Sequence, residues 1–442
     1  MLNISNRAKI YLILFHVILG LILSNFRFLS TYYGLGIIII GTYLILIYQD
    51  PKGHLPIIFS CYIMGIEVLL RMGRSTLFWE FGKYAIIYFI FLGIIRKSKE
   101  ININVPILFY FLLLSLSIIL VPYNSFSQWR QDIAFNLAGP AVLMISSIYF
   151  FNTRISKIEL LNILSFAIYP IISMSVFVYL KMPDIQTYNF LPYSNPSTSG
   201  GYGPNQVSTI FGLGVAILVL SQILRGKIFG SKAIDLSILI LFFSLGLMTF
   251  SRGGILAAII TISITMIYHL FHDQKRILIF IKGIGISIII IISWFVIAEI
   301  TNGVINKRYG LGNASYTEKL FGDLTGRTEL YKIDFLIFSD NIFTGVGPGQ
   351  ANLKRLDYGY GRSAAAHTEY SRMLSEHGFL GLVSLFILLG FPFYFFNSSN
   401  GALTKLIIIY FSTLILLTMF HSAIRVSMPA LMFGFIFADF ED

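Results

Sequence analysis

Long runs of apolar residues follow one another along this sequence, and they limit what the chain can fold into. A helix rises 1.5 Å per residue, so about 20 residues cross a hydrocarbon layer of ~30 Å, and several runs approach that length. Only 12% of the residues are charged, whereas a soluble domain has about 25%. The sequence therefore predicts an all-α polytopic membrane protein and excludes a soluble globular domain.

Fourteen apolar runs are separated by polar or charged breaks. They lie at about 10–24, 32–48, 54–70, 77–95, 105–121, 131–151, 159–180, 206–224, 234–250, 254–271, 277–298, 378–396, 405–420 and 428–440. Because the last run is short, we expect twelve to fourteen transmembrane helices. An even number places both termini on one side of the membrane. No small-residue cleavage site follows the first run, so we interpret it as an uncleaved helix.

Lysine and arginine are divided unequally between the two sets of connections. If the N-terminus is cytoplasmic, the inner connections hold thirteen of these residues and the short outer connections hold seven. Cytoplasmic loops carry such an excess, so we expect both termini inside the cell. The same pattern explains the net charge of +11 without a nucleic-acid partner. The single cysteine, Cys61, excludes an intramolecular disulfide and a cysteine-based metal site.

One outer connection, residues 299–377, is far longer than the others. It carries nine basic and nine acidic residues, so its composition resembles that of a small soluble module. Leu330, Ile333 and Ile337 recur within it at helical spacing and predict an amphipathic helix, while a capping box at 315–318 predicts another. We therefore expect three parts: a helical membrane region at 1–298, a loop module at 299–377 and C-terminal membrane helices at 378–442.

Three outer segments place an ionisable residue at the expected start of a helix. They are Ser251-Arg252-Gly253-Gly254, Thr325-Gly326-Arg327, and Ala364-Ala365-Ala366-His367-Thr368-Glu369-Tyr370 leading to Arg372. Unpaired amides beside an arginine form an anion site. Two successive glycines in a helix start indicate close approach of a ligand or another backbone. The alternative interpretations are a snorkelling interfacial arginine, a solvated loop arginine and a surface histidine.

Signatures of metal and cofactor binding are missing from the sequence. It contains no His-Glu-x-x-His motif, no Asp-x-Asp motif and no clustered carboxylates. The glycine-rich stretch 345–349 lacks the Lys-Ser/Thr of a phosphate-binding loop, so we interpret it as a tight turn. We expect neither a metal ion nor a cofactor.

The order of these segments resembles a known family. Arg252 opens a span, Arg327 and the glycine turn follow in the long loop, and His367 precedes Gly378-Phe379-Leu380-Gly381. This arrangement resembles the O-antigen ligase/polymerase family of bacterial membrane glycosyltransferases, over roughly residues 200–390. The resemblance implies a GT-C-like helical fold with one long, partly helical periplasmic loop, in a multi-pass protein of the bacterial inner membrane.

The resemblance also implies roles for particular residues. The family's catalytic loop histidine corresponds to His367, and its diphosphate-binding arginines correspond to Arg252 and Arg327, with a further loop arginine at Arg308. The remaining implied substrate-binding candidates are Asn205, which follows Pro204 as in an earlier loop of the family, Glu369 and Arg372.

The implied reaction moves a glycan from undecaprenyl diphosphate to an acceptor hydroxyl on the periplasmic face, without a metal ion. Inversion at the anomeric carbon follows from a single displacement. Opposite charges attract strongly near a low-dielectric membrane edge, so arginines suit the diphosphate, and a histidine with a pKa near 6.5 can remove the acceptor proton. The implied partners are the lipid-linked glycan, the bilayer, and either lipid A core or a second glycan, which leaves ligase and polymerase both open.

A transporter or flippase of a lipid-linked or amphiphilic substrate is the competing interpretation. Transporters place ionisable residues near the bilayer midplane on interrupted helices, and three prolines within apolar runs could interrupt helices here. Glu67 and Arg71 stand four residues apart near an outer span end, where a structural ion pair is the simpler interpretation. A structural membrane protein without activity is the third possibility.

Overall fold

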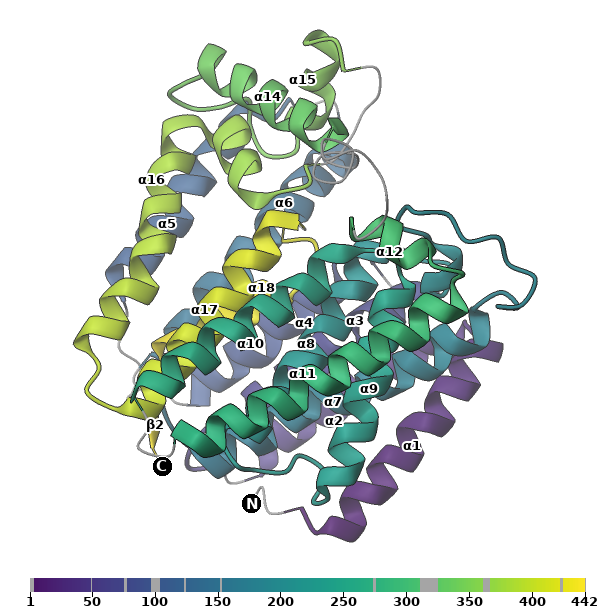
Figure 1. The fold of residues 1–442 in the computed structure, drawn as a ribbon. Helices are drawn as coiled ribbons and strands as arrows, with labels where there is room; N and C mark the ends of the chain where they lie inside the picture. The colour runs from purple at the N-terminus through teal and green to yellow at the C-terminus, as the bar shows by residue number, and fades with distance from the viewer. Residues whose placement is uncertain are drawn as a thin grey trace.

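The computed structural model is built almost entirely of helices (Figure 1). It describes residues 4–48, 50–74, 78–96, 104–122, 125–151, 153–272, 276–310, 325–360, 366–421 and 424–441. Each of the fourteen apolar runs contributes a helix. Ten of the described helices are long and apolar enough to cross a membrane. The chain is therefore an all-α polytopic membrane protein, as the apolar runs predict.

The helices of the membrane body follow in chain order. They are α1 (Asn6–Asn25), α2 (Leu29–Ile47), α3 (Leu55–Met72), α4 (Phe81–Arg96), α5 (Val105–Leu116), α6 (Phe126–Phe150), α7 (Lys157–Lys181), α8 (Pro204–Ile223), α9 (Lys232–Met248), α10 (Arg252–His272), α11 (Arg276–Ile300), α16 (Glu369–Ser398), α17 (Ala402–His421) and α18 (Met428–Gly434). Short 3-10 turns extend α5 and α18: η1 (Ser117–Leu120) and η3 (Phe435–Phe437). A third, η2 (Ser197–Ser199), lies before α8. Local chemistry fixes several helix starts, such as the capping box of Ser156 and Glu159 at α7.

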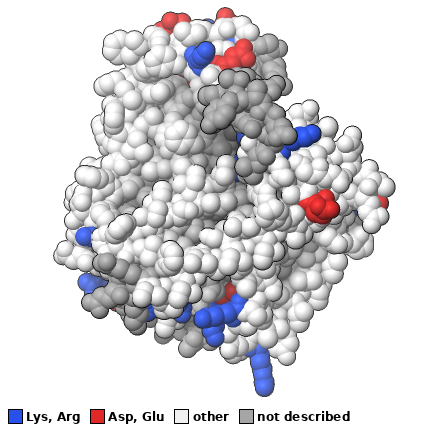
Figure 2. All heavy atoms as spheres, in the orientation of Figure 1, with Lys and Arg blue, Asp and Glu red and all other residues white. Residues whose placement is uncertain are grey.

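The centre of the body is formed by α3, α7 and α8. In α3 and α8, 89% of an 18-residue apolar stretch is buried inside the protein, whereas in α11 only 17% of the corresponding stretch is buried. A Cβ atom on Gly65 of α3 would lie 2.3 Å from the carbonyl oxygen of Ala167 in α7, so the missing side chain lets the two backbones pack closely. The peripheral helices present apolar side chains outward, and Figure 2 shows a mostly uncharged band between two charged ends on the face drawn.

Both chain ends lie at the same end of the body (Figure 1), as an even number of crossings requires. There, β1 (Arg154–Ser156) pairs in parallel with β2 (Asp439–Glu441), with Arg154 opposite Asp439. Between residues 428 and 437, α18 and η3 cover a rise of only about 15 Å. The residues just before them, 424–427, therefore lie within the helical body and not at its far end.

The opposite end carries a module of two helices, α14 (Thr325–Asp340) and α15 (Ala351–Asp357), beside α16, whereas α12 (Val304–Arg308) lies on the body next to α11 (Figure 1). Leu330, Ile333 and Ile337 of α14 are 3%, 7% and 0% exposed and pack with Tyr360 in a small separate core. The amphipathic helix predicted from their spacing is confirmed. The capping box predicted at 315–318 lies outside the described residues.

Buried polar contacts attach this module to α16. Arg355 donates from Nε to Asp334 at 2.7 Å, and the hydroxyl of Ser371 in α16 donates to the same carboxylate at 2.6 Å. Burial raises the pKa of Asp334, and the Arg355 charge and the Ser371 hydrogen bond oppose that rise. The predicted tight turn at 345–349 is confirmed, and its Gly347 amide donates to the carbonyl of Glu376 at 2.9 Å.

Candidate functional site

Asn205, Arg252 and Arg308 come together where α8 and α10 begin. The Ser251 hydroxyl donates to the Asn205 side-chain oxygen at 2.7 Å. The next residue, Arg252, donates from its guanidinium to the backbone carbonyl of Arg308 at 3.2 Å. Three candidates from separate segments of the sequence thus form one polar cluster at the end of the body that lies opposite the termini.

Arg308 supports an unusual turn in this cluster. Phe250 has a φ of +54°, which is unfavourable for a bulky side chain and costs on the order of 1–3 kcal/mol. Arg308 is 6% exposed and donates from Nε to the Phe250 carbonyl at 2.7 Å. Its buried guanidinium therefore fixes the turn that delivers Ser251 and Arg252 to the start of α10.

The glycine pair after Arg252 is explained by helix packing. A Cβ atom on Gly253 would lie 2.1 Å from the His421 ring, and one on Gly254 would lie 2.2 Å from the carbonyl oxygen of Ser208 in α8. The close approach predicted from these glycines therefore occurs, with another backbone and a histidine ring as the neighbours. The pair is not independent evidence for a ligand.

His367 lies just before α16, with both of its chain neighbours held in place. Arg425 donates to the Ala366 carbonyl at 2.5 Å. Thr368 caps α16, and its hydroxyl oxygen accepts from the Tyr370 amide at 3.0 Å. The His367 side chain itself is half-buried. The backbone on either side of His367 is therefore held by one distant residue, Arg425, and by one local helix cap.

Arg327, a further candidate, and the nearby His377 lie apart from these groups. Arg327 lies in the first turn of α14, and its side chain is outside the described residues. His377 is fully buried and shares a 2.5 Å hydrogen bond with the Ser117 hydroxyl. His377 is therefore part of the packing between α16 and the end of α5, which indicates a structural role.

Glu369, Arg372 and Glu376 form a buried charge network on the first turns of α16. The Arg372 guanidinium donates to both Glu369 carboxylate oxygens and, at 2.8 Å, to Glu376. Glu369 also accepts from the Ile424 amide at 3.1 Å. Each carboxylate is hydrogen-bonded to Arg372, so the buried charges of this network are paired. The two candidates Glu369 and Arg372 therefore contact each other, and Glu376 is a member that the sequence analysis did not name as a candidate.

Arg71 of α3 connects the two groups of candidates. Its guanidinium donates at 2.9 Å to the Gln206 side chain, next to Asn205, and at 2.9 Å to the Arg425 carbonyl. Sequence reasoning noted Arg71 only as a partner for Glu67, and that ion pair is confirmed at 2.7 Å. The second oxygen of Glu67 accepts from both the amide and the hydroxyl of Ser427, each at 2.7 Å.

The buried charges near α3 and α4 therefore serve to hold structure. Lys83 lies 2.6 Å from Glu80, and Arg71 lies 3.7 Å from the same carboxylate. These three residues and Glu67 make four charged side chains. Each is at most 5% exposed, and they face one another. This mutual pairing gives no support to a transport role for these residues.

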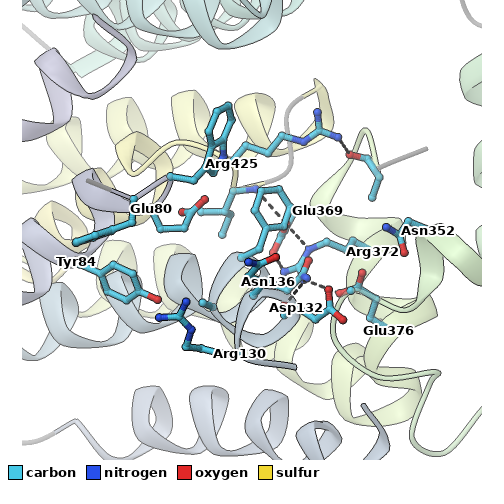
Figure 3. Close-up of a pocket in the computed structure, with 18 of the residues that line it drawn as sticks. Glu80, Tyr84, Arg130, Asp132, Asn136, Asn352, Glu369, Arg372, Glu376 and Arg425 are labelled. Carbon is cyan, nitrogen blue, oxygen red and sulfur yellow. Dashed lines mark hydrogen bonds and ion pairs between the residues drawn. The ribbon is translucent and has the colours of Figure 1, made fainter. Parts of the chain in front are cut away.

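A cavity of about 700 Å³ opens beside the α16 network (Figure 3). Its walls come from the start of α4, the first half of α6, α15, α16 and the 424–425 segment. The lining residues are Phe78, Trp79, Glu80, Tyr84, Arg130, Gln131, Asp132, Ala134, Phe135, Asn136, Gly349, Asn352, Arg355, Ala366, Glu369, Arg372, Glu376, Ile424 and Arg425. This volume lies within the usual range for ligand pockets, about 300–1,000 Å³.

The cavity contains only part of the set predicted from sequence. Glu369 and Arg372 line it, and so does Ala366, the residue before His367. The α8 and α10 cluster is not part of its wall. Over the described ranges, no three His, Cys, Asp or Glu side chains gather as metal ligands would.

Comparison with known proteins agrees with the motifs. Residues 237–387, about a third of the chain, match the family model described as O-antigen ligase. No curated protein matches the sequence. The matched segment contains Arg252, Arg308, Arg327, His367 and Arg372. Over residues 237–387, the chain is therefore similar to the O-antigen ligase family.

Proposed function

We propose that the protein transfers a glycan from undecaprenyl diphosphate to an acceptor hydroxyl at the periplasmic face of the bacterial inner membrane. The observation that supports this proposal is that residues outside the family segment connect two groups of candidates that lie largely within it. Arg71 joins the arginine cluster of α8, α10 and α12 to the segment that holds Ala366, next to His367. An anion-binding group and a base are thus supported by one hydrogen-bonded frame.

In this proposal Arg252, Arg308 and Arg327 stabilise the diphosphate, which gains negative charge as it leaves the sugar. Arg252 stands at the start of α10, where the helix dipole also favours an anion. Arg308 contributes by fixing the turn before it. A guanidinium can donate two hydrogen bonds to two phosphate oxygens at once. It therefore both orients the leaving group and lowers the energy of the developing charge.

His367 acts as the general base. It removes the proton of the acceptor hydroxyl while that oxygen forms a bond to the anomeric carbon and the bond from that carbon to the diphosphate oxygen breaks. One displacement from the opposite face inverts the anomeric configuration. Removing a general base slows such a step by about 10²- to 10⁴-fold. Either a lipid A core or a second glycan can supply the hydroxyl.

The test is transfer from purified undecaprenyl-diphosphate glycan by protein in detergent, with EDTA present. We expect His367→Ala to abolish turnover while donor binding persists, because the arginines that hold the diphosphate are unchanged. The matched control is His272→Ala, since His272 is exposed at the last turn of α10, near the end of the body that carries the termini. Near-normal turnover in His367→Ala, or loss of wild-type activity in EDTA, would overturn the mechanism.

A further inference from the structure

We propose that the cavity beside α16 binds a sugar of the acceptor glycan, and that Arg130 selects an acidic sugar there through its carboxylate. This inference rests on the proposed glycan transfer and names a feature of its substrate. The cavity has two walls of different origin. One comes from the family segment, and the other, which holds Arg130, comes from residues 78–84 and 130–136, outside that segment.

The wall outside the family segment is rich in exposed aromatic side chains. Phe78, Trp79, Tyr84 and Phe135 are 46%, 50%, 38% and 37% exposed although they line a cavity. Aromatic faces beside a few well-placed polar groups are the usual make-up of a ligand pocket. Sugars suit such a wall, because their C–H faces contact aromatic rings while their hydroxyls form hydrogen bonds.

The polar groups of the cavity are mostly satisfied within the protein. Asp132 accepts from Gln128 at 3.0 Å and from Gln350 at 3.3 Å. Glu369 and Glu376 are held by Arg372, and Glu80 lies 2.6 Å from Lys83. The carboxylates of Asp132, Glu369 and Glu376 are therefore hydrogen-bonded within the protein, and that of Glu80 is ion-paired with Lys83.

Arg130 differs from the other arginines of the wall. Arg355 pairs with Asp334, and Arg425 donates to the Ala366 carbonyl. Arg130 is exposed and forms no hydrogen bond or ion pair with any residue that the structure describes. Figure 3 shows its guanidinium close to the Tyr84 hydroxyl. Together they offer five N–H donors and one hydroxyl, an arrangement that fits the two oxygens of a carboxylate.

A second observation in the same cavity also indicates a ligand. The side-chain oxygen of Asn352 is buried and has no hydrogen-bond partner among the described residues. A buried acceptor without a partner is unfavourable, and a sugar hydroxyl would satisfy it. Asn352 comes from α15 and Arg130 from α6, so one ligand in the cavity can meet both walls.

The position of the cavity favours the acceptor over the donor. Ala366 lines the cavity and is bonded to His367, the proposed base. Arg252, proposed to hold the donor diphosphate, and Arg308, which fixes the turn before it, are not among the lining residues. A glycan held here would present a hydroxyl toward the base, and the wall that holds Arg130 would set which sugar is accepted.

The experiment compares two acceptor oligosaccharides that differ in one group: a glucuronic acid, or the glucose obtained by reducing its carboxyl. We expect Arg130→Gln to raise KM for the acidic acceptor about tenfold, with little change in kcat or in KM for the donor, and to leave the neutral acceptor unchanged. For Arg130→Lys, KM for the acidic acceptor should lie between the values of the wild type and of Arg130→Gln. The control is Arg154→Gln, because Arg154 is an exposed arginine in β1, at the opposite end of the body.

Equal loss with both acceptors, a raised KM for the donor, or no change would each overturn the inference. Equilibrium binding of the same oligosaccharides without donor separates this inference from the proposed reaction. If the wild type transfers no glycan yet binds the acidic oligosaccharide better than the neutral one, and Arg130→Gln removes that preference, the subsite stands and the reaction fails. If the wild type transfers glycan but shows no preference for the acidic oligosaccharide, the proposed reaction stands and the acidic-sugar subsite fails.

Discussion

Gly378 offers the sharpest test of how α16 is built, because its backbone suits almost no other residue. Its φ of +59° and ψ of −135° interrupt the helix between the charge network and the long apolar part of α16. A Cβ atom here would lie 2.5 Å from the Gly345 nitrogen and 2.6 Å from the Ile342 carbonyl oxygen. Both neighbours are backbone atoms, so rotation of a side chain cannot relieve the contact.

The expected loss of stability in Gly378→Ala can be worked from these two facts. A non-glycine residue in this region of backbone space costs about 1–3 kcal/mol. Overpacking against fixed atoms adds about 1–3 kcal/mol. The free energy of unfolding should therefore fall by about 2–6 kcal/mol, a large share of the 5–15 kcal/mol typical of a folded protein.

The assay is denaturant unfolding in detergent micelles, followed by tryptophan fluorescence. The control is Gly390→Ala in the same helix, where a Cβ would meet nothing within 4 Å. It should be neutral or stabilising by up to about 1 kcal/mol, because alanine is the better helix former. If the two variants unfold within about 0.5 kcal/mol of each other, the kink at Gly378 does not exist as described.

Two other substitutions test the frame and the anion site. Glu67→Gln should lower the free energy of unfolding by about 3–5 kcal/mol, because it leaves Arg71 buried with a weaker partner. The measurement is denaturant unfolding in detergent micelles. A free energy of unfolding equal to that of the wild type would show that the network is dispensable. Arg252→Lys should lose most transfer activity but retain more than Arg252→Ala, because an ammonium keeps the charge without the planar fork. Full activity at normal protein level would reduce Arg252 to a surface charge.

The helical body and the amphipathic α14 could be predicted from sequence because each depends on local patterns. Leu330, Ile333 and Ile337 show their shared face in their spacing alone. The glycines at 253 and 254 indicated a close approach, but spacing could not name His421 as the neighbour. Apolar runs of similar composition do not encode which helix ends meet.

The frame around His367 shows the same limit more strongly. Ser427 contacts Glu67 across 360 residues of sequence, and no short-range pattern relates them. Arg130 counted only toward the charge of an outer connection, since its place in a cavity depends on how α6 lies against α4 and α16. Residues that act alone, such as a loop histidine, can be recognised from a motif, whereas residues that act through distant partners require the fold.

The ion pair within α3 also bears on how the protein is made. Glu67 and Arg71 enter the membrane early in synthesis, while the Ser427 and Arg425 backbone groups that later complete their hydrogen bonds follow more than 350 positions downstream. A lone charge in a nascent membrane helix is costly. Because the two side chains are one helical turn apart, each serves as the other's counterion until residues 425–427 have been synthesised. The α3 helix can therefore be inserted into the bilayer and remain there before its later partners, Arg425 and Ser427, are translated.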